Sequence, residues 1–229
     1  MCGRVDIHTP PSQLARLLEV QLAAGVDPEG RPSWNVPPAR GVPAITERHT
    51  HTGSGDGPGH ERVMDVLRWG LVPHWAPDLK FGNRCFNARS ETLAKAPAFR
   101  AAFQARRCLV PMNAFYEWSG PTAHRTRHRI GPQGQPLFAL AGLWERWGGE
   151  EDRVETFTII TCEPNAVMAR IHDRMPVILD APQCEAWLLA PSQELLVPYA
   201  GELAIVPPAP PPKGGGHGAA SGSTQLPLI

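Results

Sequence analysis

The sequence lacks several features that define common protein classes. It has no uninterrupted apolar run of about 18 residues, which excludes a membrane-spanning helix. Its first residues, Met1-Cys2-Gly3-Arg4, lack the apolar stretch of a signal peptide. The five cysteines (2, 85, 108, 162 and 184) are odd in number and widely spaced, and no two form a CxxC pair. This spacing argues against a zinc ribbon and against a disulfide framework, so we expect a cytoplasmic protein.

A long helical bundle is also disfavoured, because proline and glycine supply 48 of the 229 residues. Hydrophobic residues make up 42% of the chain, which is enough for the core of one domain. Strand-like runs outnumber helical ones without a regular strand–helix alternation. The expected fold class is therefore α+β, with a mostly antiparallel sheet or barrel-like core and short flanking helices. We assign the domain to residues 2–206 and interpret the Pro-, Gly- and Ser-rich residues 207–229 as a disordered tail.

The individual elements follow from hydrophobic pattern and helix-start signals. Strands are predicted over residues 3–8, 42–46, 63–70, 108–118, 138–147, 154–161 and 175–179. A helix is predicted after Pro10 and Pro11, with Thr9 as N-cap and with leucines 14, 17, 18 and 22 on one face. Further helices are predicted over 90–107, interrupted near Pro97, and from Asp180 as N-cap to Leu189. Residues 25–43 are predicted to form a loop, and 165–171 a short helix or turn.

A polar stretch at residues 49–60 separates two of the predicted strands. It holds histidines at 49, 51 and 60, but no carboxylate or cysteine stands at the spacing of metal ligands. We interpret it as a hairpin tip and expect neither a metal nor a cofactor.

The net charge of zero hides an uneven distribution. Residues 1–83 carry a net charge of −1, residues 84–129 of +7, and residues 130–229 of −6. The basic middle third fits a phosphate-binding face, or alternatively a solvated surface balanced in space by the acidic third.

Cys2 carries the most distinctive chemistry. Methionine aminopeptidases remove Met before small residues, so the mature chain is expected to begin at Cys2. An α-amine has a pKa of about 7.8, against about 10.4 for lysine, so far more of it is nucleophilic at neutral pH. The amine can condense with an aldehyde to an imine, and the adjacent thiol can then close a five-membered thiazolidine. Taken alone, Cys2 is also compatible with an accident of position.

Six motifs in order give the chain a family resemblance. They are Met1-Cys2-Gly3-Arg4, Trp34-Asn35-Val36-Pro37-Pro38, Trp69-Gly70-Leu71-Val72-Pro73-His74-Trp75, Phe86-Asn87-Ala88-Arg89-Ser90-Glu91-Thr92, Phe115-Tyr116-Glu117-Trp118 and Ile171-His172-Asp173-Arg174-Met175-Pro176. Over about residues 2–190 the chain resembles the SRAP (SOS response-associated peptidase) family, the sensors of abasic sites in DNA. It departs from the family after Leu189, where only Leu203–Pro207 stands in place of a longer closing segment.

The resemblance implies a set of catalytic residues. Cys2, freed of Met1, would attack the ring-opened aldehyde of an abasic deoxyribose in single-stranded DNA and form a shielding thiazolidine cross-link. Asn87 resembles the residue that positions the N-terminus, Glu117 the general acid/base, and His172 the residue that assists proton transfer at the sugar oxygen. From pattern alone, Glu117 is equally an ordinary strand residue, Asn87 a turn residue and His172 a surface ion-pair member.

The same motifs supply the expected contacts to DNA. Arg4, Arg89 and Arg174 are candidates for phosphate contact, Asn35 for a DNA contact, and Trp34 and Trp75 for base stacking. Trp118, Trp144 and Trp187 are expected in the core. The basic hairpin residues His124, Arg125, Arg127, His128 and Arg129 extend this footprint or form a solvated tip. The expected partner is single-stranded DNA with abasic sites, bound by a monomer.

Two other functions remain open at this level. Cys2 and His172 could form a cysteine peptidase that removes Met1, and an imine intermediate would permit a lyase reaction. The chain could also be a module that binds single strands without a covalent bond, in which case binding would be reversed by salt.

Overall fold

The computed structural model describes residues 2–50 and 59–206. Most of the predicted hairpin tip, residues 51–58, and the predicted tail, residues 207–229, lie outside the described residues. Within them the strands are β1 (Val5–Ile7), β2 (Gln21–Leu22), β3 (Ser33–Val36), β4 (Gly41–Thr50), β5 (Gly59–Trp69), β6 (Asn87–Arg89), β7 (Arg107–Met112), β8 (Ala114–Ser119), β9 (Thr126–Pro132), β10 (Phe138–Trp147), β11 (Val154–Cys162), β12 (Met175–Pro176), β13 (Ile178–Leu179) and β14 (Leu203–Ile205). The α-helices are α1 (Pro11–Leu17), α2 (Arg100–Ala105) and α3 (Ala181–Leu189), and the 3-10 helices are η1 (Leu79–Arg84), η2 (Thr122–His124) and η3 (Met168–Arg170).

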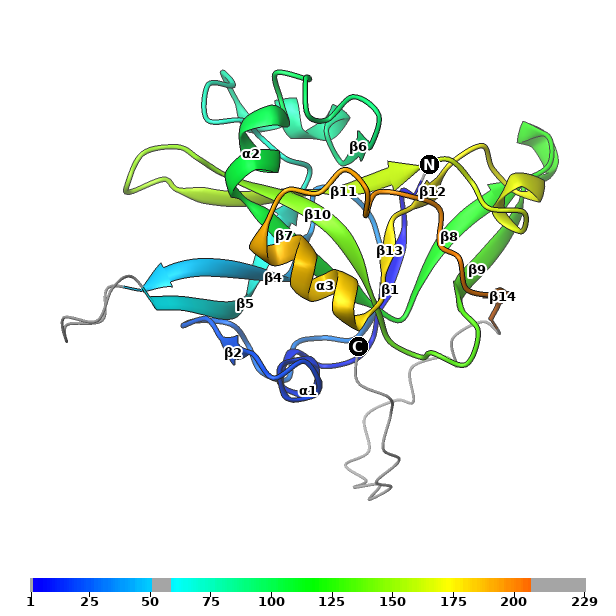
Figure 1. The fold of residues 1–229 in the computed structure, drawn as a ribbon, viewed down its shortest axis with the longest axis horizontal. Helices are drawn as coiled ribbons and strands as arrows, with labels where there is room; N and C mark the ends of the chain where they lie inside the picture. The colour runs from blue at the N-terminus through cyan, green and yellow to red at the C-terminus, as the bar shows by residue number, and fades with distance from the viewer. Residues whose placement is uncertain (1, 51–58, 207–229) are drawn as a thin grey trace.

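The larger of two sheets closes into a barrel. Its strands run in the order β12-β11-β10-β7-β4-β5-β2, mostly antiparallel (Figure 1). β5 also pairs in parallel with β11, through Arg68 with Thr156 and Trp69 with Phe157. This pairing closes β5, β4, β7, β10 and β11 into a ring, which confirms the predicted α+β fold with a barrel-like core. The rings of Trp69 and Phe157 stack 6.3 Å apart in its buried interior.

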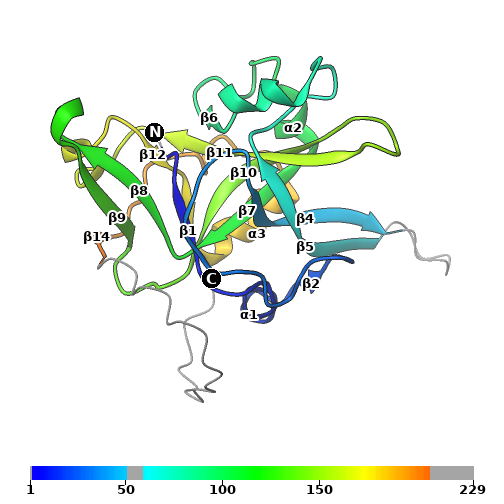
Figure 2. The same cartoon turned by 180° about the vertical axis from the view of Figure 1, so that it is seen from behind.

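The smaller sheet carries the N-terminal strand. Its five strands follow the order β14-β9-β8-β1-β3, so β1 lies between β8 and β3 (Figure 2). Val5 of β1 pairs with Phe115 on one side and with Val36 on the other. All three side chains are buried in the core that the two sheets share. The first residues of the chain are therefore held in the middle of a sheet.

The predicted strand 108–118 is two strands, and the prediction of one was wrong. β7 belongs to the barrel and β8 to the smaller sheet, and the chain changes sheet at Asn113. The Asn113 carboxamide accepts hydrogen bonds from the main-chain amides of His8 and Thr9 and donates to the carbonyl of Pro136. A side chain that binds three main-chain groups fixes the corner between the sheets. An apolar run does not reveal such a corner, because both of its halves are buried.

Five other predictions about the elements need correction. The helix predicted over 90–107 is confined to α2, because residues 90–99 form turns ahead of it. Residues 25–43 are not all loop, since they contain β3. Thr9 does not cap α1: Pro10 is its N-cap, and the Thr9 hydroxyl bonds to Asn113 instead. In addition, the predicted strand 175–179 is split into β12 and β13, and Leu22 lies in β2 rather than on the helix.

Other elements match the sequence closely. β10 spans the predicted residues 138–147, and β11 exceeds its predicted end by one residue. Asp180 caps α3 through a reciprocal capping box with Gln183. α3 packs on the outside of β7 and β10 (Figure 1). β14 pairs with β9 and so completes an edge of the smaller sheet.

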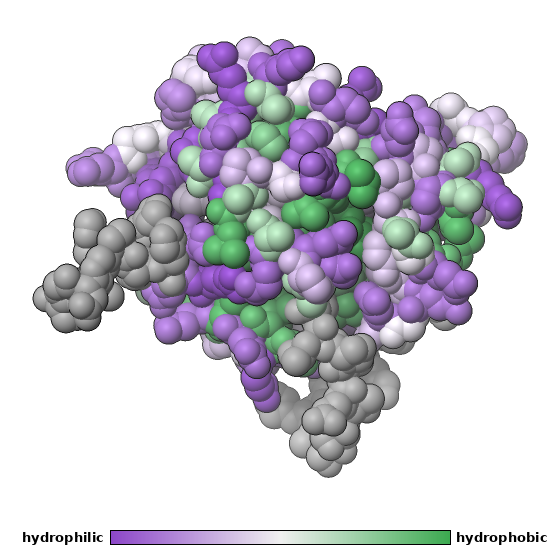
Figure 3. Space-filling view, viewed as in Figure 1, coloured by the Kyte–Doolittle hydropathy of each residue, from purple (hydrophilic) through white to green (hydrophobic). Residues whose placement is uncertain are grey.

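The surface is predominantly hydrophilic on the face shown in Figure 3. Among the described residues, large hydrophobic side chains with substantial exposure are scattered over the chain: Val66, Trp75, Val167, Leu189, Val197 and Ile205. No helix in the described part of the chain is long and apolar enough to cross a membrane. All five cysteines are buried and free of disulfides.

Candidate active site

Cys2 lies just before β1, at the end of the β1–β8 ladder. The main-chain amide of Tyr116 donates to the carbonyl of Arg4, which extends the ladder one residue beyond Val5. Continuing that register places residue 3 opposite Glu117, and the charge of Glu117 acts on the Cys2 thiol, so Cys2 lies close to this carboxyl group. The Cys2 side chain is only 1% exposed. Burial raises the pKa of its thiol above the ordinary value, and the nearby charge of Glu117 raises it further.

Asn87 reaches Cys2 from a different part of the fold. It opens β6, which pairs in parallel with β11 and matches Asn87 to Ile159. Its Nδ2 donates a hydrogen bond to the main-chain carbonyl of Cys2 over 2.8 Å. Its Oδ1 is buried and has no hydrogen-bond partner among the described residues. Since a buried amide oxygen is costly to leave unpaired, this acceptor is available for an N–H group beside Cys2.

Glu117 points into the same place from β8. Glu117 is only 2% exposed, although its position between Tyr116 and Trp118 in β8 also fitted a solvent-facing strand residue. Burial raises the pKa of its carboxyl group above the ordinary value, and a positive charge on His172 opposes the rise. Glu117 is therefore not an ordinary solvent-facing strand residue. Its interactions with Cys2 and with His172 place the three side chains in one cluster.

His172 occupies the turn between η3 and β12. Its Nδ1 accepts a hydrogen bond from the main-chain amide of Arg174 at 3.0 Å, and the Asp173 carboxylate lies 2.8 Å from the same nitrogen. When Nδ1 accepts from Arg174, the neutral ring carries its proton on Nε2. The imidazole then presents an N–H donor, and it is partly exposed to solvent. The four predicted catalytic residues thus converge from four segments far apart in the sequence.

Arg174 is engaged within the protein. Its guanidinium binds both carboxylate oxygens of Glu91, at 2.7 and 3.0 Å, and donates to the carbonyl of Thr161 at 2.6 Å. The hydrogen bonds from Arg174 lower the pKa of Glu91. A phosphate would have to share this guanidinium with Glu91, so the predicted DNA contact of Arg174 remains a prediction. No role was predicted for Glu91; its position in the Phe86–Thr92 motif was the available signal.

The other predicted DNA contacts lie at or near the surface. Arg89 ends β6 and is exposed, as is Asn35 in β3. Trp75 is 49% exposed and meets the edge of Phe81. Arg4 is partly buried. The structure leaves these side chains accessible to a ligand, and their contacts with DNA remain predictions.

The remaining tryptophans and the residues of the basic hairpin differ in their exposure to solvent. Trp144 and Trp187 lie in the core as predicted, but Trp118 is only partly buried, because it precedes the turn at the end of β8. His124, Arg125 and Arg127 are exposed. Arg129 instead forms an ion pair with the fully buried Asp6, a structural contact that the charge count did not reveal.

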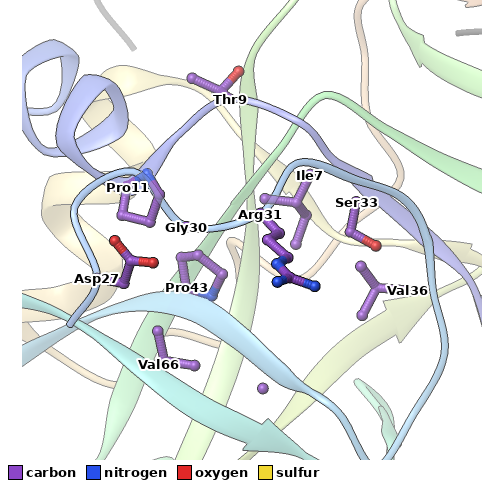
Figure 4. Close-up of a pocket in the computed structure, with 11 residues that line it drawn as sticks. Ile7, Thr9, Pro11, Asp27, Gly30, Arg31, Ser33, Val36, Pro43 and Val66 are labelled. Carbon is purple, nitrogen blue, oxygen red and sulfur yellow. The ribbon is translucent and has the colours of Figure 1, made fainter. Parts of the chain in front are cut away.

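One pocket of about 200 Å³ lies away from this cluster (Figure 4). It is lined by Ile7, Thr9, Pro11, Asp27, Gly30, Arg31, Ser33, Val36, Gly41, Pro43 and Val66. These residues adjoin the C-terminal end of β1, whereas Cys2 precedes its N-terminal end. None of the four predicted catalytic residues lines this pocket. In the described part of the chain, no group of three or more His, Cys, Asp or Glu side chains is arranged to hold a metal ion.

Comparison with known proteins identifies one family and several relatives that are named for abasic site processing. The model of the SOS response associated peptidase (SRAP) family matches residues 1–207. The abasic site processing protein YoaM of Bacillus subtilis is 38% identical over 209 residues, which cover 87% of this chain and 86% of the relative. The abasic site processing protein YobE of the same organism is 40% identical, with 87% and 90% covered. The abasic site processing protein HMCES of Xenopus tropicalis is 32% identical over 225 residues, with 82% and 66% covered.

Solved structures support the fold. A protein from Bacteroides thetaiotaomicron superposes with a TM-score of 0.76 at 25% identity, covering 90% of this chain and 92% of that one. A protein from Bordetella bronchiseptica gives a TM-score of 0.70 at 22% identity, with 90% and 100% covered. The family match extends to residue 207, so β14 lies within the matched domain.

Proposed function

Because the chain belongs to the SOS response-associated peptidase family, we propose that it processes abasic sites in DNA as part of the response to DNA damage. Relatives that match most of its length are named abasic site processing proteins. The observation that carries the proposal is the convergence of Asn87, Glu117 and His172 on the buried Cys2. An amine, a thiol and two acid/base groups in one place suit an aldehyde substrate.

The proposed reaction begins with the α-amine of Cys2 after Met1 has been removed. The amine attacks C1 of the ring-opened deoxyribose, and the carbinolamine loses water to give an imine. The Cys2 sulfur then adds to the imine carbon while its proton passes to the nitrogen, and a thiazolidine results. One water is released overall, and no oxidant or reductant is needed. Ring closure within one residue profits from the high effective molarity of an intramolecular nucleophile.

Asn87 has two roles in this proposal, one for each end of its carboxamide. Nδ2 holds the Cys2 carbonyl, which fixes the rotation of the residue. Oδ1 is the buried acceptor that one hydrogen of the Cys2 amine would fill. An amine held in this way keeps its lone pair directed at the substrate.

Glu117 and His172 divide the proton transfers. With a raised pKa, Glu117 holds a proton closer to neutral pH and can give it to the departing hydroxyl of the carbinolamine. As a carboxylate it can then accept the proton from the thiol. His172 can donate from Nε2 to the ring oxygen while the sugar opens. The imine formed on the way would also permit β-elimination, which is the proposed origin of any strand cleavage.

A general cysteine peptidase is the weaker alternative. A peptidase cysteine reacts as a thiolate and needs a lowered pKa, whereas burial and Glu117 both raise the pKa of Cys2. Addition to an imine tolerates a neutral thiol, provided that a base accepts its proton. Removal of Met1 by the protein itself remains compatible with the site. The other alternative, purely reversible binding of single strands, does not explain why Asn87, Glu117 and His172 surround the buried Cys2.

Intact-mass spectrometry tests the proposal. The protein is incubated with a single-stranded oligonucleotide that contains one abasic site and is then denatured. The expected product is the chain without Met1 plus the oligonucleotide, less one water. Cys2→Ala should give an adduct only after borohydride reduction, because an imine without a thiol is hydrolysed. Cys184→Ala serves as the matched control, since Cys184 is another buried, free cysteine but lies in α3. Retention of Met1 together with the absence of any adduct would contradict the proposal.

A further inference from the structure

The pocket of about 200 Å³ described above, which we call the β3 pocket, combines an apolar wall with an exposed apolar rim. Ile7, Pro11 and Val36 line it and are buried. Val66 of β5 also lines it but is 45% exposed, which makes it one of the few large hydrophobic side chains with substantial exposure in the described part of the chain. A ligand in the β3 pocket would therefore cover apolar surface that the described residues leave in contact with solvent.

The β3 pocket also offers hydrogen-bond donors and acceptors. The Arg31 side chain points into the space between Pro43 and Val36 (Figure 4). Among residues 2–50 and 59–206 its guanidinium has no hydrogen-bond or ion-pair partner, so its N–H donors are available to carbonyl oxygens. Asp27 lines the pocket as well, and one of its carboxylate oxygens accepts from the main-chain amide of Glu29 at 3.1 Å. Apolar surface, a donor and an acceptor together suit an extended peptide with aliphatic side chains.

The same chain contains a segment of this chemistry. Residues 225–229 are Gln225-Leu226-Pro227-Leu228-Ile229, and their three large aliphatic side chains are the only ones beyond residue 206. The 18 residues between, 207–224, are proline, glycine, alanine, serine and threonine with one lysine and one histidine. A cavity of about 150 Å³ holds a benzene molecule, which has more heavy atoms than a leucine side chain, so the β3 pocket has room for one. Residues 225–229 thus form an aliphatic segment at the far end of a linker.

The register of the smaller sheet gives the distance that the linker has to span. Consecutive strand pairs form one row across this sheet, through Ile205, Ile130, Phe115, Val5 and Val36. Ile205 ends β14, the last described strand before the linker, and Val36 lines the β3 pocket. Four strand spacings separate the two ends of the row, which is at most about 19 Å. The linker therefore starts in line with the pocket that it would have to reach.

The length of the linker matches this span. A Gly- and Ser-rich chain of 18 residues has a root-mean-square end-to-end distance of about 23 Å, and prolines such as the five in residues 207–212 lengthen it. The effective concentration of a tethered ligand is highest when the linker length matches the span, and it reaches the millimolar range for short linkers. A segment that binds in isolation with a Kd of about 100 μM would then be docked about 90% of the time. Weak contacts therefore suffice for docking within one chain.

We propose that the β3 pocket docks residues 225–229 of its own chain. Leu226 and Leu228 lie on the same side of an extended segment and cover Val66, while Arg31 binds a main-chain carbonyl of the segment. The proposal goes beyond the proposed function, because neither DNA nor Cys2 takes part in it. The β3 pocket adjoins the C-terminal end of β1, whereas Cys2 precedes the N-terminal end of that strand.

Methyl NMR of the full chain without DNA tests the docking. The unmodified protein is compared with a variant that carries both Leu226→Ser and Leu228→Ser. The methyl signals of Val36 and Val66 should differ between the two proteins, because the serines no longer cover them. The signals of Val197, which is 48% exposed but does not line the pocket, should coincide.

A peptide added in trans measures the strength of the contact. A peptide with the sequence of residues 224–229, added to the double-serine variant, should move the Val36 and Val66 signals back towards their positions in the unmodified protein. Adding Val66→Asp to that variant should weaken the peptide at least tenfold, because the buried apolar contact is lost. Arg31→Ala should weaken it about tenfold, the usual effect of losing a hydrogen bond to a charged group.

Matched variants keep the interpretation specific. Val197→Asp and Arg153→Ala, which change an exposed valine and an exposed arginine outside the pocket, should leave the affinity for the peptide unchanged. The docking is overturned if the valine signals of the unmodified protein and the double-serine variant coincide, or if Val66→Asp weakens the peptide no more than Val197→Asp does. Signal differences that persist on dilution support docking within one chain. Differences that vanish on dilution would show that a second copy supplies the segment, and would overturn the assignment to the same chain.

Discussion

The side-chain amide of Asn87 donates a hydrogen bond to the main-chain carbonyl of Cys2 over 2.8 Å, although the two residues are 85 positions apart in the sequence. The bond joins β6, an addition to the edge of the barrel sheet, to the segment that enters the smaller sheet. It therefore ties the segment that precedes β1 to the barrel. The position of Cys2 thus depends on a contact between the two sheets. The predicted catalytic residues come from different segments of the chain.

Removal of this contact should affect the reaction more than it affects stability. Asn87→Ala leaves the Cys2 carbonyl unbound and the Cys2 residue free to rotate. We expect adduct formation to slow by about 10²-fold, the usual effect of a misplaced reacting group, and the free energy of unfolding to fall by about 1 kcal/mol. Single-turnover cross-linking rates and urea unfolding measure the two effects. Asn83→Ala, at an exposed position in η1, is the control, and an equal loss of rate in both variants would refute the positioning role.

The raised pKa of Glu117 predicts a pH-dependent effect on stability. A carboxyl group whose pKa is higher in the folded state binds its proton more tightly there, so folding is disfavoured as the pH rises from the ordinary value near 4.5 through the folded pKa. Glu117→Gln removes this penalty. Relative to the unmodified protein, the variant should thus be more stable at pH 8 than at pH 4, while its cross-linking is slower.

Urea unfolding of both proteins at the two pH values provides the measurement. Glu194→Gln, in which an exposed carboxyl group is replaced, should show no such difference. A difference between Glu117→Gln and the unmodified protein that is independent of pH would mean that Glu117 is ionised at the same pH in the folded and unfolded states.

The fold could be predicted where local signals agree with the final structure. β10 and β11 are long runs of buried residues, and α3 has a capping box, so their positions followed from the sequence. The failures occurred where a long-range contact decides the local conformation. Asn113 ends β7 because it binds the chain near Thr9, more than a hundred residues away. Short-range periodicity contains no information about that contact.

The candidate site also depends on long-range contacts that local sequence patterns do not reveal. Glu117 lies between Tyr116 and Trp118, and its alternation is that of an exposed strand residue. Its carboxyl group nevertheless lies near the Cys2 thiol and His172, a long-range arrangement that alternation along one strand does not reveal. Only the order of motifs along the sequence indicated that these residues belong together. The pairing of Arg174 with Glu91 was not foreseen, because ion pairs between distant segments leave no pattern in the sequence.

Arg174 and Glu91 offer a test of structural coupling near the site. Arg174→Ala leaves both Glu91 and the Thr161 carbonyl without their donor, and should lower the free energy of unfolding by about 2 kcal/mol. Glu91→Ala should cost less, because Glu91 is 43% exposed and solvent screens the pair. The double variant should show a coupling of about 0.5–1 kcal/mol by urea unfolding.

The pH dependence of this coupling has the opposite sign to that of Glu117. Arg174 lowers the pKa of Glu91, so the ion pair contributes its stability above the ordinary pKa near 4.5 and loses it as the pH falls through the lower folded value. The coupling measured at pH 7 should accordingly be absent well below the folded pKa of Glu91. A coupling that persists under strongly acidic conditions would show that the contact is not an ion pair.

The last prediction separates His172 from Glu117 by the step that each assists. His172 is partly exposed in a turn, and its Nδ1 accepts from Arg174, so the neutral ring carries its proton on Nε2. That donor suits protonation of the sugar ring oxygen, a step that an already opened lesion does not need. Glu117 is buried next to Cys2, and in the proposed reaction it assists imine formation from either lesion. His172→Ala should therefore slow adduct formation on a closed abasic site and have a much smaller effect on a ring-opened analogue.

Glu117→Gln should slow adduct formation on both substrates and suppress strand cleavage in parallel. Loss of a general acid or base typically costs about 10²–10⁴-fold, and we expect the lower end, because an α-amine is already reactive near neutral pH. Single-turnover rates on the two lesions, for both variants, decide between the roles. If His172→Ala were equally slow on the closed and the opened lesion, ring opening could not be the step that His172 assists. The proton at Nε2 would then have to act after the aldehyde has formed, in the same step as Glu117.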